Sequence, residues 1–403
     1  MTMSEVPTHV PDTCPVVHFD NSRNQPVGGY FQELDEMREL APAVWNTFGQ
    51  GFWVVTRFDD QRAAYQDYET FTSESIIAVD PNPQYMWIPT LVDGPDHTQY
   101  RRLLNGYFSP ANVAKREEQN REIARKIIEE LKAKGSCDLA HEFCGEFPTR
   151  AFFALAGFDQ KDAPRMVELV TTIFDQMSNP DDHSAQAAAA GEISEYFAKL
   201  LDDRRANPRD TSTDLTSHLL TCTFNGEPLT QETLLNILGV IILAGLDTMK
   251  CQLGYSFYHL ATFPEDRQRI LDDPSLIPSF VEESLRYYTI VQPARKLGKD
   301  VEFAGCPMKK GEMVLLDLAQ SCRDPEAFPE ADKFIIDRQN NKHLAFGPGA
   351  HRCMGSHLAR QELVIAIEEW HKAIPNYELT NTEPLTEHGG QRGVNSIPVR
   401  WDI

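Results

Sequence analysis

FGPGAHRCMG, the stretch from Phe346 to Gly355, lies near the C-terminal end of this chain of 403 residues. Its first two glycines and the proline between them predict a tight, irregular backbone with Cys353 at the tip. A helical pattern from His357 to Trp370 follows at once. The free amides of such a loop and the positive end of the helix both favour an ionised sulfur. The pattern therefore predicts a thiolate at Cys353 that is placed to bind an electrophilic group.

The same stretch resembles the Phe-Gly-x-Gly-x-His-x-Cys-x-Gly signature of the cytochrome P450 family, the haem-thiolate monooxygenases, and agrees with it at every fixed position. In that family the cysteine is the axial ligand of the haem iron. The resemblance implies that Cys353 ligates the iron of haem b and that Phe346 and His351 also contact the cofactor. A buried cysteine in a glycine-rich turn is the alternative for the motif alone, but other motifs of the family follow.

The length and composition of the chain indicate one large soluble domain. No Ser/Gly-rich linker, repeat or low-complexity tract divides it, so we expect an irregular lead-in over residues 1–27 and a single domain over residues 28–403. The apolar content of 41% is sufficient for a large core. The family resemblance covers about residues 28–401, and it implies a mainly helical fold with a minor β region around a buried haem.

Membrane and disulfide signals are weak in this sequence. No stretch approaches the roughly 18 uncharged apolar residues of a membrane span, and residues 1–15 lack the basic and apolar regions of a secretory leader. We therefore expect a cytoplasmic protein, monomeric and without a membrane partner. The eight cysteines stand without Cys-x-x-Cys pairs, which argues against a structural zinc and against a disulfide framework.

The net charge of −22 disfavours nucleic acid and anionic membranes as partners. It leaves room for a local basic patch. The resemblance implies that a ferredoxin and its reductase deliver electrons at the proximal face, the side of the haem that carries the cysteine. Candidate basic residues on that face are Arg102, Lys342, His343 and Arg352.

A helix capped by Thr230 is predicted to run without interruption to Thr262, which makes a rod of roughly 48 Å. Its middle is apolar on nearly all sides, so an aspartate there is costly and needs a reason. The resemblance supplies one: Gly245 opens a groove for dioxygen, and the catalytic pair Asp247 and Thr248 relays protons. An incidental kink is the structural alternative.

Cationic side chains that suit the haem propionates occur at two places. His97 and Arg101 are four residues apart and therefore share one face of a predicted helix. Arg295 stands just before a β pattern. The resemblance implies that these three residues and His351 hold the propionates.

The segment from Ser73 to Asp93 lacks helical periodicity and is long for a loop, which suggests a functional one. By resemblance to the small terpene-hydroxylating members of the family, Tyr85 is a polar anchor for substrate and Trp87 a packing wall; ordinary surface aromatics are an equally good explanation. The expected pocket residues are Tyr85, Trp87, Val240, Leu243, Ala244, Ile290, Val291 and Val394. Phe174 and Met177, before a predicted lid loop at 178–182, are further candidates that core packing explains as well.

Glu283 and Arg286 are three residues apart on another predicted helix. A surface ion pair is one explanation. The resemblance implies instead a buried pair, joined by Arg338, that stabilises the core behind the haem.

Together these motifs predict a monooxygenase that hydroxylates a small hydrophobic substrate, with a terpenoid favoured. It would use dioxygen as co-substrate and two electrons from the ferredoxin system. A peroxide-driven hydroxylase of fatty-acid-like substrates is one alternative, and Asp247 argues against it. A haem-thiolate ligand sensor without turnover is another, and the intact proton relay argues against that.

Overall fold

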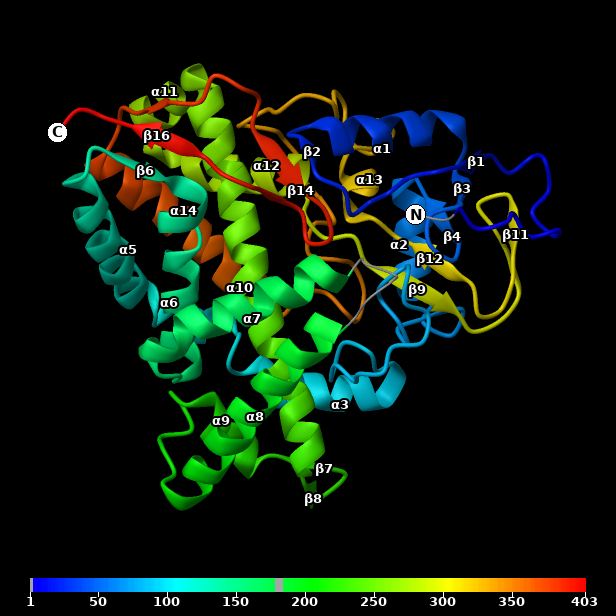
Figure 1. Cartoon of the computed structure of the whole chain (residues 1–403), viewed down its shortest axis with the longest axis horizontal. Coiled ribbons are helices and arrows are strands. Elements are labelled where there is room, and N and C mark those ends of the chain that lie inside the picture. The colour runs from blue at the N-terminus through cyan, green and yellow to red at the C-terminus, as the bar shows by residue number, and fades with distance from the viewer. Residues whose placement is uncertain (1–2, 178–183) are drawn as a thin grey trace.

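The computed structural model describes residues 3–177 and 184–403. Helices occupy one side of the molecule, and most of the strands lie on the other side with α1 and α2 (Figure 1). The predicted fold class, mainly helical with a small β region, is confirmed. The predicted lid loop at 178–182 lies outside the described residues, as does the side chain of Met177.

The helices are α1 Gly29–Leu40, α2 Phe58–Gln66, α3 Gly94–Asn105, α4 Pro110–Ala114, α5 Glu117–Lys132, α6 Glu146–Ala156, α7 Ala163–Met177, α8 Ser184–Ala206, α9 Leu215–Thr221, α10 Gln231–Thr262, α11 Pro264–Asp272, α12 Ile277–Tyr287, α13 Leu318–Cys322 and α14 Ser356–Ala373. Short helical turns are η1 Leu139–Phe143, η2 Gln160–Asp162 and η3 Pro274–Leu276. The amphipathic stretch between Pro110 and Lys132 forms two helices, α4 and α5.

The strands are β1 Val16–Val17, β2 Gln25–Pro26, β3 Ala43–Asn46, β4 Phe52–Val55, β5 Phe71–Thr72, β6 Ser136–Asp138, β7 Thr223–Phe224, β8 Glu227–Pro228, β9 Ala294–Leu297, β10 Val301–Phe303, β11 Cys306–Met308, β12 Met313–Leu315, β13 Glu378–Leu379, β14 Thr386–His388, β15 Gly393–Val394 and β16 Pro398–Arg400. The segment predicted as an irregular lead-in thus contributes β1 and β2, which pair with β3 and β14.

The largest sheet has six strands in the order β1-β3-β4-β12-β9-β5. Residues of β3 and β4 are buried on both faces, which explains their unbroken apolar runs. Gly49 and Gly51, in the turn between these strands, both have the positive φ that glycine tolerates. The sheet brings Arg295 of β9 opposite Val314 of β12, deep inside the molecule.

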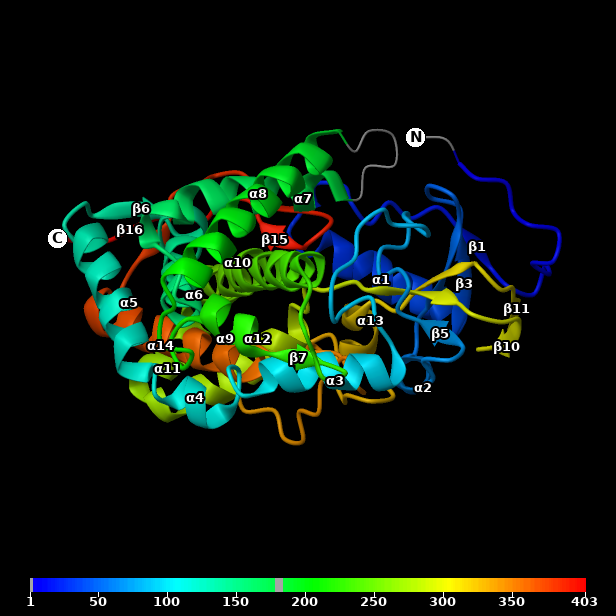
Figure 2. The ribbon, with the colours of Figure 1, turned by 90° about the horizontal axis from the view of Figure 1, so that it is seen from below.

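Helix α10 runs through the middle of the helical side (Figure 2) and contacts α6, α7, α8, α12 and α14. Its cap is as predicted, because the Thr230 hydroxyl accepts a hydrogen bond from the Thr233 amide at 3.1 Å. The helix is long and apolar enough to span a membrane, with mean hydropathy 1.7 over a window that is 61% buried in the fold. The expectation that no stretch approaches such apolarity is therefore wrong for α10. The helix is apolar because other helices surround it.

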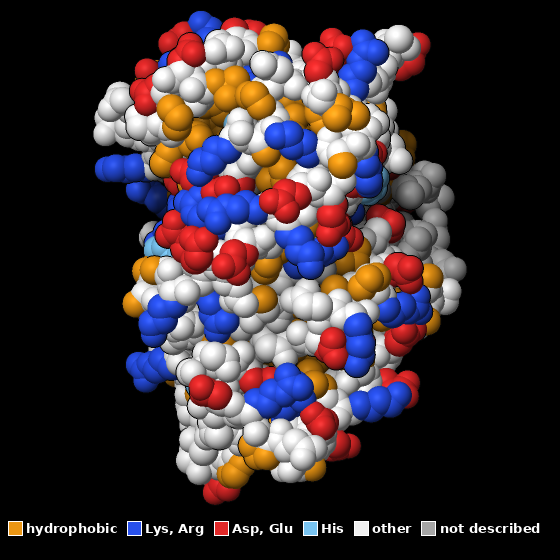
Figure 3. Space-filling model, turned by 90° about the vertical axis from the view of Figure 1, so that its left-hand side faces the viewer, with side chains coloured by type: hydrophobic (Ala, Val, Ile, Leu, Met, Phe, Trp, Pro, Cys, Tyr) orange, Lys and Arg blue, Asp and Glu red, His pale blue; other side chains and the backbone are white. Residues whose placement is uncertain are grey.

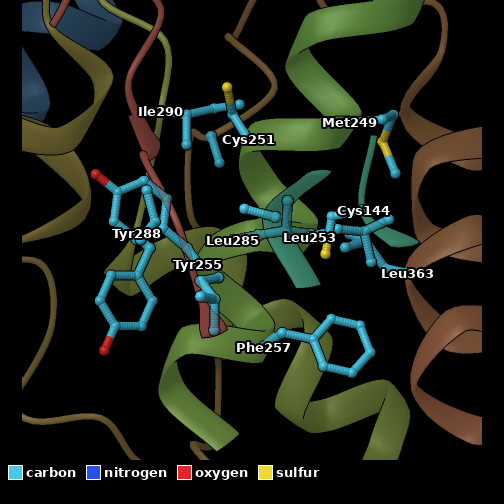
Figure 4. Close-up of a cluster of buried hydrophobic side chains, with 14 of the residues drawn as sticks. Cys144, Met249, Cys251, Leu253, Tyr255, Phe257, Leu285, Tyr288, Ile290 and Leu363 are labelled. Atoms are coloured by element: carbon cyan, nitrogen blue, oxygen red, sulfur yellow. The ribbon is translucent and has the colours of Figure 1, made fainter. Parts of the chain in front are cut away.

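The C-terminal half of α10 lies in the largest hydrophobic cluster (Figure 4). Leu253, Tyr255 and Phe257 are fully buried there beside Leu285 of α12 and Leu363 of α14. This packing fixes the rod on which the predicted catalytic residues stand.

The predicted core network is present. Both Glu283 carboxylate oxygens accept hydrogen bonds from Arg286, at 2.7 and 2.8 Å, and Arg338 donates to Glu283 at 3.0 Å. All three side chains are buried. The prediction of a buried pair joined by Arg338 is confirmed.

One cysteine pair corrects the expectation drawn from cysteine spacing. Cys14 and Cys306 form a disulfide that joins the N-terminal segment to β11, across a sequence separation of 292 residues. The local spacing gave no sign of it because 292 residues separate the two partners.

Candidate functional site

The cysteine loop is held open by glycine geometry. Gly347 and Gly349 have φ values of 68° and 77°, and a Cβ on Gly349 would lie 3.0 Å from the carbonyl oxygen of Tyr65. The Cys353 amide donates to the Phe346 carbonyl at 2.8 Å, which closes the loop just before α14 begins. Both features explain why this stretch forms a tight loop with the sulfur at the helix N-terminus.

The Cys353 sulfur is surrounded by groups that favour negative charge. Burial raises the pKa of the Cys353 thiol, whereas the Gly355 amide and the guanidinium groups of Arg101, Arg352 and Arg360 act to lower it. Arg101 also donates to the Arg352 carbonyl at 2.7 Å and so ties α3 to the loop. A thiolate here needs a further positive partner to offset its desolvation, and a metal ion would provide it.

The four predicted propionate ligands lie close together. The rings of His97 and His351 stack with centroids 4.0 Å apart, and both histidines are within electrostatic reach of Arg295 and Arg101. Burial, His351 and Arg101 lower the pKa of His97 to about 4. Burial lowers the pKa of His351, although its neighbour Asp93, 2.9 Å from His351 Nε2, acts to raise it.

This group, which we call the histidine–arginine cluster, consists of His97, Arg101, Arg295 and His351. Its Arg295 is buried and donates to the Ala294 carbonyl at 2.8 Å. The Nε2 atom of His97 is buried and has no hydrogen-bond partner among the described residues. Four nitrogen-bearing side chains around a single carboxylate, Asp93, form a site suited to an anionic ligand.

Helix α10 presents the two predicted catalytic residues on different sides. The Thr248 hydroxyl donates to the Ala244 carbonyl at 2.7 Å, and Ala244 is exposed although its neighbour Leu243 is buried. Asp247 is buried, and its burial raises the pKa of the carboxyl while Lys250 and His388 oppose that shift. The Ala244 side of the helix is therefore exposed, whereas Asp247 faces a polar cavity described below.

Gly245 allows close packing of two helices. A Cβ on Gly245 would lie 2.4 Å from the ring of Phe152 on α6. The absent side chain therefore lets α6 and α10 approach each other. The groove for dioxygen that the family resemblance implies at Gly245 stays a prediction.

The predicted pocket residues come from more than one hydrophobic cluster. Trp87, Val240 and Leu243 belong to the hydrophobic cluster that surrounds the first half of α10, whereas Ile290 and Val394 belong to the cluster of its second half. Val291 lies at the edge of that second cluster and of the cluster around the large sheet.

The loop aromatics Tyr85 and Trp87 stack with ring centroids 4.4 Å apart. The Tyr85 hydroxyl is buried and makes no hydrogen bond of good geometry with the described residues. Burial, with the negative charge of Asp80 nearby, raises the pKa of Tyr85. The phenol therefore stays protonated and can donate a hydrogen bond.

A polar cavity of about 430 Å³ lies between α7, α10 and the β14–β15 hairpin. Asp247, Lys250 and His388 line it together with Phe174 and Val394. Sequence reasoning missed Lys250 and His388. Lys250 could have been found from its i+3 spacing to Asp247, but nothing local to His388 signals its approach to α10.

The exposed basic residues expected at the proximal face are Arg102, Lys342 and Arg352. His343 does not belong with them, because its side chain is buried and its Nε2 lies 3.0 Å from Glu282. On the face that carries α5, basic and acidic side chains alternate (Figure 3), as in the ion pairs of Arg121 with Glu117 and Glu368. That face offers no uniformly basic patch.

Comparison with known proteins identifies the class. The family model described as Cytochrome P450 matches residues 45–370, and the chain belongs to this family. Members bind haem b and are monooxygenases that use dioxygen, so the predicted family, enzyme class and cofactor are confirmed.

Particular relatives are bacterial proteins. The probable cytochrome P450 127A1 of Sinorhizobium fredii is 32% identical over 88% of this chain and 84% of its own length. The mycinamicin IV hydroxylase/epoxidase of Micromonospora griseorubida is 30% identical over 95% of this chain and 98% of its own. The crystal structure of CYP101J2 matches with a TM-score of 0.89 at 29% identity, covering 100% of both chains.

The residues present fit haem b. The histidine–arginine cluster offers an unpartnered buried nitrogen and buried positive charge for the propionates, and the cysteine loop offers a sulfur that needs a positive partner. The exposed Ala244 lies on the helix that carries the proton-relay candidates. These features belong to the cysteine loop, α3, β9 and α10.

Proposed function

We propose that this P450 hydroxylates a small hydrophobic, terpenoid-like substrate that carries one oxygen atom. The observation that carries the proposal is the buried Tyr85 hydroxyl, which has Asp80 as a neighbour but makes no hydrogen bond of good geometry, on a ring that stacks against Trp87. A buried donor without a partner is costly, and a ketone or ether oxygen of a bound ligand would satisfy it. The rest of such a ligand would contact apolar side chains.

In this proposal Cys353 is the axial ligand of the haem iron, and the histidine–arginine cluster holds the propionates with Phe346 packed beside the cofactor. The bound haem supplies the activation of dioxygen and electron-rich thiolate ligation favours O–O cleavage. Thr248 and Asp247 hold and move protons on the α10 side. The Thr248 hydroxyl is anchored on the Ala244 carbonyl, so its oxygen is fixed and can accept a proton from solvent or from Asp247.

The pocket in this proposal is lined by Tyr85, Trp87, Val240, Leu243, Ala244, Ile290, Val291 and Val394. Four of these, Val240, Leu243, Ile290 and Val394, are buried apolar side chains, which suits a ligand recognised mainly by shape. Two electrons would come from a ferredoxin and its reductase at the proximal face, where Arg102, Lys342 and Arg352 are exposed. We also infer a cytoplasmic monomer with one domain over residues 28–403.

The names of relatives support hydroxylation of hydrophobic molecules in general. They include a methyl-branched lipid omega-hydroxylase of Mycobacterium tuberculosis and a vitamin D(3) 25-hydroxylase of Pseudonocardia autotrophica. Those substrates differ widely in size, so the choice of a small terpenoid depends on the Tyr85 loop alone.

Binding titrations with matched ligands test the proposal. Monoterpenoid ketones and their parent hydrocarbons would be titrated into the haem-containing protein while its Soret band reports binding. We expect Tyr85→Phe to weaken ketone binding roughly threefold to tenfold, because one hydrogen bond is lost, and to leave hydrocarbon binding unchanged. The exposed Tyr68 provides the control variant Tyr68→Phe, which should bind both ligands like the wild type.

Equal ketone affinity in wild type and Tyr85→Phe would remove Tyr85 from the site. Measurements of product distinguish the ferredoxin-driven reaction from the peroxide-driven one. We expect more product with a ferredoxin system than with hydrogen peroxide. The reverse order would favour the peroxide-driven alternative.

A further inference from the structure

The polar cavity described above gives Asp247 an approach that shares Phe174 and Val394 with the predicted pocket but is otherwise lined by different residues. Thr171 and Phe174 of α7, Asp247 and Lys250 of α10, and the hairpin residue His388 line it. Polar cavities of this size hold water. Protons from solvent can therefore come close to Asp247 without crossing the apolar pocket.

Two neighbours on α10 hold the Asp247 carboxylate. Lys250 Nζ lies 3.7 Å from one oxygen, and the Cys251 thiol donates to the other at 3.6 Å. The same thiol lies 4.0 Å from Nε2 of His388. Cys251 therefore touches both the carboxylate and the imidazole, and places them on either side of one sulfur atom.

The orientation of the His388 ring follows from its hydrogen bonds. Asn395 donates through Nδ2 to the Thr386 hydroxyl at 2.8 Å, so its amide oxygen faces His388. That oxygen lies 2.8 Å from Nδ1 of His388, which must therefore carry a hydrogen. The other ring nitrogen, Nε2, is left to accept a proton on the side of Cys251 and Asp247.

Gly393 allows this close approach. A Cβ at position 393 would lie 2.7 Å from the Cys251 sulfur and 2.7 Å from a ring carbon of His388. Gly393 also pairs with His388 in the β14–β15 hairpin. The hairpin can thus bring an imidazole against α10 only because this residue has no side chain.

We propose that His388 is a proton-relay residue that passes protons from the water of this cavity to Asp247. Nε2 takes a proton from a hydronium ion or a buffer acid in the cavity and gives it, through cavity water, to the Asp247 carboxylate. The carboxyl then passes its proton to the Thr248 side and returns to the carboxylate. Each monooxygenation consumes two protons and two electrons, so the relay turns over with every product formed.

The proposal rests on the proposed role of Asp247 in proton delivery. Burial raises the pKa of Asp247, and the positive charges of Lys250 and His388 oppose that shift. The titratable or charged groups facing His388 and the cavity are Asp247, Lys250 and Cys251 of α10, Asp175 of α7 and His141 of η1.

The first test measures whether His388 and Asp247 titrate together. The pKa of His388 would be measured by NMR of the labelled imidazole in the haem-containing protein, with the signal assigned by its absence in His388→Gln. We expect the pKa of His388 to fall by about one unit in Asp247→Asn, because a nearby carboxylate favours the imidazolium. An unchanged pKa would overturn the proposal. This test needs no substrate, so it stands even if the proposed substrate class is wrong.

The second test measures the share of electrons that appears in product, with any substrate that the wild type oxidises. In the wild type we expect the share of electrons that appears in product to fall as the pH rises and His388 loses its proton. We expect His388→Gln to lower this share at least threefold and to abolish this pH dependence. The control His141→Gln, which changes another histidine of the same cavity, should match the wild type.

The relay would be overturned if the share of electrons in product were unchanged in His388→Gln. It would also be overturned if His141→Gln lowered this share equally. If His388→Gln folds poorly, His388→Asn keeps a donor at the Nδ1 position and serves instead. A protein that binds haem but oxidises nothing would count against the proposed function, and the NMR test would then decide the contact between the two residues.

Discussion

Thr248 donates its hydroxyl hydrogen to the carbonyl of Ala244 at 2.7 Å, one turn back along α10. This bond fixes the hydroxyl oxygen on the side of the helix where Ala244 is exposed and leaves its lone pairs free. Because its hydrogen is already donated, the Thr248 hydroxyl can accept a hydrogen bond on this side of α10. Asp247 lies on the adjoining side of the helix.

We expect Thr248→Ala to leave ligand binding within about twofold of the wild type and to divert electrons from product to hydrogen peroxide. The reason is that the variant removes the fixed hydroxyl but no pocket wall. The measurement compares product and peroxide formed per electron pair, with Thr221→Ala, an exposed threonine, as control. Unchanged coupling would show that protons reach the cofactor without Thr248.

Gly245→Ala should destabilise the fold by about 1–3 kcal/mol, because its methyl group would overlap the Phe152 ring. Urea unfolding measures the change, and the double variant with Phe152→Leu should recover part of it. Gly239 offers a control, since a Cβ there meets nothing within 4 Å. If the Gly245→Ala protein instead had wild-type stability and consumed dioxygen at a different rate, Gly245 would act as the predicted groove for dioxygen and not in helix packing.

The pH dependence of stability should include a contribution from His371, whose pKa burial lowers to about 4. In the unfolded chain this imidazole binds a proton below about pH 6.5, whereas in the fold it stays neutral until about pH 4. Stability therefore falls as pH falls through this window, by about 1.4 kcal/mol between pH 7.5 and pH 5.5.

Urea unfolding at the two pH values measures this effect. His371→Gln should reduce the loss of stability by that amount, and the control His357→Gln, at an exposed position, should behave like the wild type. An equal loss in His371→Gln and wild type would exclude His371 as its source.

Because of the disulfide between Cys14 and Cys306, the number of cysteines that alkylation labels should depend on whether the protein has been reduced. Alkylation of the unfolded, non-reduced protein should label six cysteines, and reduction should raise the number to eight. Cys14→Ser should lower stability by about 2–4 kcal/mol, since a very long loop is no longer closed. Labelling of all eight without reduction would mean that the bond does not form.

The sequence was sufficient for features that depend on residues close together in the chain. The glycine loop at Cys353, the capped rod of α10 and the Glu283–Arg286 pair are all recognisable from local spacing. Such features can be predicted because turn geometry, capping and helical faces are set by neighbours within a few residues.

The remaining features depend on contacts between distant segments. The Phe152 ring that requires glycine at position 245, the bond from Cys14 to Cys306 and the approach of His388 to Asp247 each join elements far apart in the chain. No local pattern marks these partners, because tertiary packing alone brings them together.

The carbon monoxide spectrum of the reduced protein tests the central claim, that Cys353 holds the haem iron. We expect a Soret band at the strongly red-shifted position of thiolate ligation in the wild type, and its loss in Cys353→Ser. The control Cys222→Ser, at a partly exposed cysteine that follows the last residue of α9, should keep the band. A red-shifted band that persists in Cys353→Ser, or a wild-type band at the position of histidine ligation, would contradict the account.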